Sequence, residues 1–219
     1  MVSKWHAFVG ALALVVVLST GGAALAEPGG VVVPKGGTVA GMGYGGWLAL
    51  SWQRAFAAQV PGPGACETVE TTDGPVAVLF QSFAGGKQAY TCNEPTGRPV
   101  YVVGISKECS TLEQPPSFGK TPAELERCAP KGFVGATGTA AVDGHPVTNY
   151  TELISRTRVF TIHLPSHNII DSKEHTGQSA AYGEGLLLRG FAAGTHIIHT
   201  TSVVPMAFSA EVTYTVHVG

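Results

Sequence analysis

The chain has 219 residues, a formal net charge of −2 and only 13% charged residues. Its Lys and Arg residues do not cluster, which excludes the basic surface that binds nucleic acid or anionic membranes. Little charge together with 29 Gly and 14 Pro is typical of a domain of many short strands and excludes a disordered chain.

The first 26 residues have the parts of a secretory signal peptide. Lys4 gives a basic start, an apolar run follows at 7–18, and an A-x-A cleavage signal ends at Ala26. The apolar run is shorter than the roughly 20 residues that cross a bilayer as a helix. We therefore expect cleavage after Ala26, secretion, and no integral membrane segment in the mature protein. A flexible N-terminal segment at 27–40 and a single domain at 41–219 should follow.

Two helices are predicted. The first lies within 44–58, where four apolar residues recur at helical spacing: Leu48, Trp52, Ala55 and Phe56. The second begins with a capping box between Thr121 and Glu124, with Pro122 at the first helical position, and runs to about Cys128.

The remainder contains about eight strands at irregular spacing. We expect 75–83 and 88–92 to pair as a hairpin around the Gly-Gly turn between them. Strand 180–189 carries Gly183 and Gly185, a composition that suits a bulge. Strand 207–218 alternates apolar and polar residues throughout, as a half-buried antiparallel strand does. The pattern predicts a mainly β fold, an antiparallel, jelly-roll-like β-sandwich with one N-terminal helix and one short helix.

The four cysteines allow three pairings. We favour disulfides Cys66–Cys92 and Cys109–Cys128, because each closes a moderate local loop and an exported chain meets oxidising surroundings. The alternative is a metal site built from all four thiolates, but the closely spaced C-x-x-C pairs that such sites usually have are missing.

Several residues are candidates for chemistry. His163 and His167 are candidate metal ligands, and the alternative is that each is an ordinary hydrogen-bonded residue of a strand or loop. Glu184 is either an acid with a perturbed pKa or, as we favour, a residue on the solvent face of an edge strand. The chain has neither a G-x-S-x-G nucleophile motif nor a phosphate-binding loop, and we expect no cofactor.

Aromatic side chains gather in the first helix: Tyr44, Trp47, Trp52 and Phe56. Exposed, Tyr44, Trp47 and Trp52 would offer a platform for a sugar ring or a partner; buried, they would form the packing face of the helix, which is the commoner role. Asn149 begins an N-glycosylation sequon, whose use depends on the host.

A series of short motifs lies between 38 and 219: Tyr-x-x-Trp at 44–47 with Trp52, Cys66, Gly-Pro-Val at 74–76, Cys-x-x-Pro-x-Gly at 92–97, and Leu-x-x-Cys at 125–128. In this combination the chain resembles a family of bacterial secreted proteins of uncharacterised function. Relatives carry a Trp-Trp pair where Ser51-Trp52 stands here. The resemblance implies secretion and a β-rich, disulfide-containing fold, and it transfers no catalytic residue.

We therefore predict a secreted, non-catalytic β-sandwich that binds an extracellular glycan, an envelope component or a protein at the cell surface. One alternative is a secreted hydrolase or metal-dependent enzyme that uses His163, His167 and Glu184. A second alternative is a structural subunit of an extracellular assembly, in which strand 207–218 pairs across subunits. The sequence leaves the ligand and the oligomeric state open.

Overall fold

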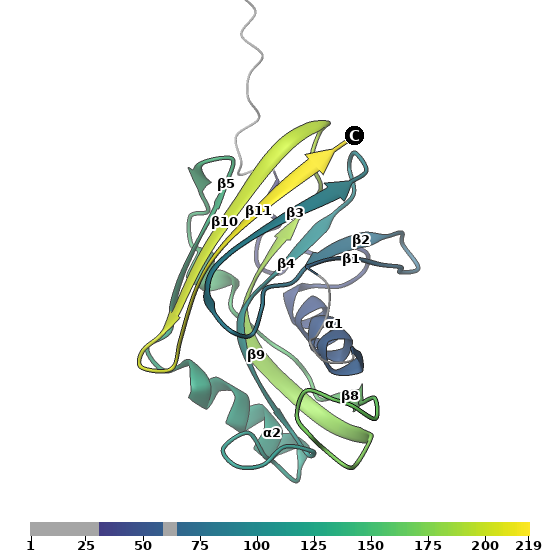
Figure 1. Cartoon of the computed structure of the whole chain (residues 1–219), viewed down its shortest axis with the longest axis vertical. Coiled ribbons are helices and arrows are strands. Elements are labelled where there is room, and N and C mark those ends of the chain that lie inside the picture. The colour runs from purple at the N-terminus through teal and green to yellow at the C-terminus, as the bar shows by residue number, and fades with distance from the viewer. Residues whose placement is uncertain (1–30, 59–64) are drawn as a thin grey trace, which may run out of the picture.

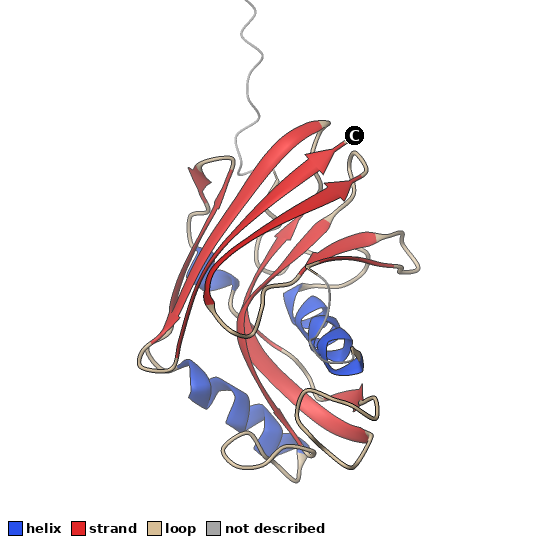
Figure 2. Cartoon of the chain, viewed as in Figure 1, coloured by secondary structure: helices blue, strands red, loops and turns tan. Residues whose placement is uncertain are grey.

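The structure, a computed structural model, describes residues 31–58 and 65–219. The expected signal peptide lies outside the described residues. Within them the fold is mainly β, with two sheets, two α-helices and two disulfides in a sandwich-like arrangement (Figures 1 and 2), so the predicted fold class is confirmed.

The first sheet is centred on two long strands that pair with each other, β4 and β9. Its strand order is β1 (Cys66–Val69), β2 (Val76–Leu79), β4 (Val100–Ser110), β9 (Thr176–Leu188) and β7 (Ser155–Arg156), and β8 (Phe160–His163) also pairs with β9. The second sheet has the order β3 (Gly86–Glu94), β11 (Phe208–Val218), β10 (Gly194–Val204), β5 (Thr137–Val142) and β6 (His145–Pro146).

Two strand pairs are parallel, β2 with β4 and β3 with β11, and the others are antiparallel. The predicted hairpin between 75–83 and 88–92 is wrong, because β2 and β3 belong to different sheets. The four residues of β2 are all buried, as in a strand covered on both faces, whereas exposed and buried residues are mixed along β3. The cross-subunit pairing of 207–218 is also wrong for this fold, because β11 already has a partner on each side.

Helix α1 (Tyr44–Ala57) matches the predicted helix and packs on the first sheet. Helix α2 (Pro122–Cys128) begins with the predicted capping box, in which Thr121 Oγ1 accepts a hydrogen bond from the Glu124 amide at 3.3 Å. It continues into the 3₁₀ helix η2 (Ala129–Phe133), and a second 3₁₀ helix, η3 (Tyr150–Leu153), lies between β6 and β7.

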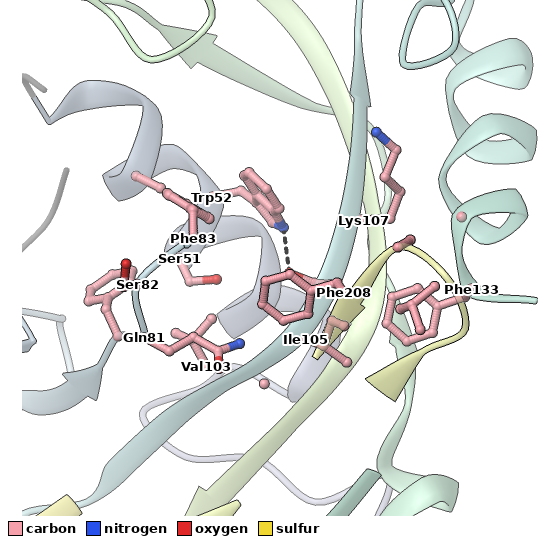
Figure 3. A pocket seen from close by; sticks show the side chains of 17 residues that line it. Ser51, Trp52, Gln81, Ser82, Phe83, Val103, Ile105, Lys107, Phe133 and Phe208 are labelled. Atoms are coloured by element: carbon pink, nitrogen blue, oxygen red, sulfur yellow. Dashed lines mark hydrogen bonds between the residues drawn. The ribbon is translucent and has the colours of Figure 1, made fainter. Parts of the chain in front are cut away.

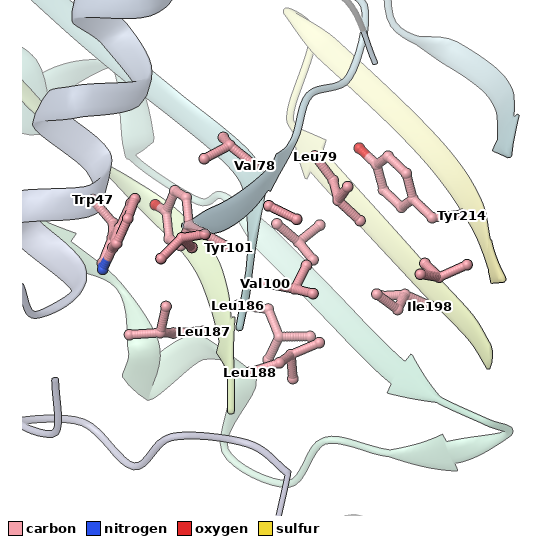
Figure 4. Packing of buried hydrophobic residues seen from close by; sticks show 14 of the residues in the cluster. Trp47, Val78, Leu79, Val100, Tyr101, Leu186, Leu187, Leu188, Ile198 and Tyr214 are labelled. Atoms are coloured by element: carbon pink, nitrogen blue, oxygen red, sulfur yellow. The ribbon is translucent and has the colours of Figure 1, made fainter. Parts of the chain in front are cut away.

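The central strands of the first sheet are buried on both faces (Figure 4). On one face, Val100 and Leu186 point toward Tyr214 of the second sheet. On the other face, Tyr101 stacks on Trp47 of α1, with ring centroids 6.0 Å apart. The first sheet therefore lies between α1 and the second sheet, and apolar side chains fill the space on each side of it.

The segment before α1 is part of this core from Val31 onward. Val33 is fully buried, and its amide donates to the carbonyl of Leu187 at 2.8 Å. Val39 is also buried, and its carbonyl accepts the indole N–H of Trp47 at 3.1 Å. Residues 31–40 therefore belong to the folded domain, which corrects the expectation of a flexible segment at 27–40 over the part that the structure describes.

Both favoured disulfide pairings are confirmed. Cys66–Cys92 connects β1 of the first sheet to β3 of the second, and Cys109–Cys128 connects β4 to α2. One disulfide thus joins the two sheets, and the other fastens the short helix to the first sheet.

Candidate functional site

An apolar groove opens beside β4, beyond the point where its neighbour β2 ends. Strand β2 ends at Leu79, opposite Val102, whereas β4 continues to Ser110. Beyond that point β4 is flanked by α1, by the loop after β2, by η2 and by the end of the β10–β11 hairpin. The groove has a volume of about 270 Å³, and aromatic and aliphatic side chains dominate its walls (Figure 3): Trp52, Phe83, Ile105, Phe133, Val204 and Phe208.

A β-bulge forms the floor of the groove. In the β4–β9 ladder, Val103 pairs with Gly185 and Ser106 pairs with Gly183, so two residues of β4, Gly104 and Ile105, lie opposite the single residue Glu184. The glycines of β9 predict a bulge here, and the extra residue lies on the partner strand, β4. Bulges bend a strand and redirect its side chains, which here places Ile105 and Ser106 in the groove.

Gly104 allows the bulge to form at this site. A Cβ atom on Gly104 would lie 2.7 Å from the Glu184 carbonyl oxygen and 2.8 Å from the Tyr150 hydroxyl. Both distances are shorter than a carbon–oxygen contact tolerates. The backbone of β4 therefore approaches β9 and η3 more closely than any other residue type would permit.

Trp52 is the one predicted binding residue that lines the groove. Its indole N–H donates to Ser106 Oγ at 3.0 Å, and its ring lies 5.9 Å from that of Phe83 and 5.5 Å from that of Phe56. Tyr44 and Trp47 are instead buried in the core. For these two residues the packing-face alternative is the observed one.

One of the large exposed apolar side chains lines the groove. Among the described residues five such side chains are exposed: Phe83 (53% exposed), Val134 (80%), Ile197 (38%), Val203 (44%) and Met206 (107%). Phe83 lines the groove itself, and Met206 lies in the β10–β11 turn beside Ala207, which also lines it. Val203 and Ile197 lie six residues apart on β10, so they share its exposed face, away from the groove.

One charged residue contributes to the lining of the groove. Lys107 is the one charged residue of its lining, but its ammonium binds Ser117 Oγ, and Figure 3 shows it directed away from Phe133 and Phe208. Its aliphatic part passes over Gly132. The Ser51 hydroxyl donates to the Leu48 carbonyl at 2.8 Å, and Ser106 accepts from Trp52.

Glu184 is fully buried, at 0% exposure, between the two sheets. The expectation of a solvent-facing residue on an edge strand is therefore wrong, because β9 is a central strand flanked by β4 and β7. Its Oε2 accepts a hydrogen bond from Ser202 Oγ of β10 at 3.4 Å, while Oε1 has no hydrogen-bond partner among the described residues. Burial raises the pKa of Glu184 to about 7, and the Ser202 hydrogen bond lowers it only in part.

The structure does not bring His163 and His167 to Glu184. His163 is on β8 opposite Thr176, eight positions along β9 from Glu184, or about 26 Å at 3.3 Å per residue. His167 is exposed in the following loop, with its Nδ1 3.4 Å from Ser166 Oγ. Over residues 31–58 and 65–219, no group of three or more His, Cys, Asp or Glu side chains is arranged to hold a metal ion. None of the helices in that part of the chain is long and apolar enough to span a membrane.

Sequence reasoning missed most of the groove, because its aromatic residues come from segments far apart in the chain. Phe83 follows β2, Phe133 ends η2 and Phe208 begins β11. The one signal in the sequence was the pair of glycines flanking Glu184, which marked the position of the bulge.

The chain matches no family model and no curated protein. Among solved structures it is similar to "Solution Structure of Amebosin", at 15% identity over 62% of this chain and 100% of that one, with a TM-score of 0.22. It is also similar to "Structure of PbICP-C in complex with falcipain-2", at 11% identity over 65% and 97% with a TM-score of 0.27. A cysteine protease inhibitor of Entamoeba histolytica, EhICP2, matches at 10% identity over 61% and 97% with a TM-score of 0.21. Likenesses with TM-scores this low carry no argument about function, which must come from the chemistry of the groove.

Proposed function

We propose that this chain is a secreted, non-catalytic binding protein that takes up an uncharged apolar ligand in the groove beside the β4 bulge. The observation that carries the proposal is an open apolar groove of about 270 Å³ whose lining includes the exposed ring of Phe83. Ligand sites are typically concave and mostly apolar with a few polar groups.

The lining favours an uncharged ligand. A charged group taken into an apolar site without a partner is strongly disfavoured, and the ammonium of Lys107 is bound to Ser117 and directed away from Phe133 and Phe208. An apolar part of an envelope component or of a partner protein meets this requirement, and a glycan, with its many hydroxyl groups, does not. Export is supported by the expected signal peptide and by two disulfides, which persist in oxidising compartments.

A neutral naphthylamine dye, N-phenyl-1-naphthylamine, tests the proposal. We expect saturable binding of one dye per chain, with a change in the emission of Trp52, whose ring lines the groove. Trp47 is buried in the core. In the variant Trp52→Phe its emission should therefore stay unchanged when the dye binds.

The matched variants are Ala207→Trp and Ile197→Trp. Ala207 lines the groove and is exposed, so a large side chain there fills the groove without disturbing the core. Ile197 is exposed elsewhere on the same hairpin. Ala207→Trp should weaken dye binding by roughly tenfold or more, and Ile197→Trp should leave it unchanged. Equal binding by both variants, or no saturable binding by the unmodified protein, would refute the proposal.

A further inference from the structure

Glu184 lies between the two sheets, next to the floor of the groove. On one side it lies opposite Gly104 and Ile105, which form the floor. On the other side its carboxyl group is bonded to Ser202 of β10, two residues before Val204 of the groove wall. Glu184 therefore connects the bulge of the first sheet, which its backbone faces, to the hairpin of the second, which its carboxyl group reaches.

The carboxyl group of Glu184 is closely surrounded, and one of its oxygens has no partner among the described residues. A Cβ atom on Gly138 of β5 would lie 2.2 Å from Glu184 Oε2 and 2.7 Å from Oε1, so any other residue there would displace the carboxyl group. Oε1 has no hydrogen-bond partner among the described residues, and neither has the hydroxyl of Tyr150 close by. A neutral carboxyl group is tolerated in such a place, whereas an ionised one is strongly disfavoured without a partner.

The groups that surround Glu184 do not compensate a negative charge. Tyr150 of η3 interacts with it electrostatically, and Tyr101 of β4 and Tyr214 of β11 interact with Tyr150. Burial raises the pKa of all three tyrosines, so they stay neutral across the physiological range. Ser202 of β10 is neutral, and β5 contributes Gly138. Among the ion pairs of the described residues none involves Glu184.

We propose that Glu184 is a proton-controlled positioning residue of the groove: when neutral it holds the β4 bulge against β10, and when ionised it draws water between these walls and lowers the affinity for apolar ligands. The proposal rests on the proposed function, because it assigns regulation to the same groove. A ligand that binds only the closed arrangement must, by linkage, also strengthen proton binding at Glu184.

The test measures binding of N-phenyl-1-naphthylamine from about pH 5.5 to about pH 8.5, a range that brackets the ionisation of Glu184. The unmodified protein should bind the dye roughly tenfold more weakly at the upper end. Binding near pH 7 should take up part of a proton, which calorimetry in buffers of different ionisation enthalpy measures. Glu184→Gln should bind with no dependence on pH and no proton uptake.

Two further variants make the result decisive. Glu94→Gln changes another buried glutamate, which is paired with Arg98 at the end of β3, and should keep the pH dependence. Ser202→Ala removes the one hydrogen bond to the carboxylate, so it should move the midpoint of the transition to higher pH, and it serves if Glu184→Gln does not fold.

Dye affinity that is flat with pH in the unmodified protein would overturn the role of Glu184 and leave the groove as the binding site. The role of Glu184 is likewise overturned if the pH dependence survives in Glu184→Gln, or if Ser202→Ala leaves the midpoint unmoved. Absence of dye binding at every pH would overturn the proposed function, and the regulation would fall with it.

Discussion

Trp52 of α1 donates its indole N–H to the hydroxyl of Ser106 on β4 at 3.0 Å, one residue beyond the bulge. This bond fixes the helix to the strand at the groove. In Ser106→Ala the indole N–H loses its partner in a half-buried site, so we expect a loss of about 1 kcal/mol in the free energy of unfolding and a shift in Trp52 emission. Urea unfolding measures the first, and Ser166→Ala, in an exposed loop, is the control that should change neither.

The buried carboxyl group of Glu184 should make stability depend on pH. Its pKa is about 7 in the folded protein against an ordinary value of 4.5, so the folded state binds the proton more tightly than the unfolded state. This stabilisation is complete below about pH 4.5 and is lost as the pH rises through about 7. The total loss should be about 3 kcal/mol at 1.36 kcal/mol per pKa unit.

Urea unfolding at a series of pH values measures this loss. Glu184→Gln should remove the dependence between about pH 5 and about pH 8, leaving only the contributions of other groups. An equal slope in the variant and the unmodified protein would show that another group is responsible.

Gly104→Ala should destabilise the protein, because the new Cβ atom would lie within 2.9 Å of the Glu184 backbone and the Tyr150 hydroxyl. We expect a cost of about 1–3 kcal/mol, typical of overpacking, together with weaker dye binding as the bulge moves. Gly43→Ala, whose Cβ would lie 3.5 Å from the Gly37 carbonyl oxygen, an ordinary contact distance, should cost less than about 1 kcal/mol and leave the groove unchanged.

The two disulfides should differ in their effect on the groove although they close loops of similar length, with separations of 26 and 19 residues. Loop-closure entropy assigns each about 3 kcal/mol. Cys109–Cys128 also holds α2 and the adjoining η2, which brings Phe133 to the groove. Replacing that pair by serines should weaken dye binding, whereas replacing Cys66 and Cys92 should lower stability alone, as thermal unfolding and dye titration together would show.

Local signals in the sequence predicted the local structure well. The spacing of apolar residues placed α1 to within a residue, and the capping box placed the start of α2. Loop length and compartment were enough to select both disulfides. Each of these features depends on residues that are close in sequence, where propensity and chain geometry dominate.

Partners far apart in the chain were not predictable in the same way. The turn at Gly85-Gly86 suggested a hairpin, yet β2 is buried on both faces and β3 belongs to the other sheet, where it pairs with β11. Glu184 was assigned to solvent because one polar residue in an apolar strand usually lies there, and its burial depends on the bulge, on Gly138 and on Ser202. The groove forms because Trp52, Phe133 and Phe208 come together in the fold. These residues are far apart in the sequence, so no local pattern predicts their contact.

The parallel pairing of β3 with β11 has a consequence for how the protein is made. Gly86 pairs with Ala210, a separation of 124 residues, and Tyr90 stacks on Tyr214 with centroids 5.6 Å apart. Contacts between such distant segments form slowly, because a long loop must close before any contact is gained. The second sheet cannot be completed until the last strand has been synthesised. A chain that leaves the cell N-terminus first would therefore emerge with this sheet still open and would complete its fold outside.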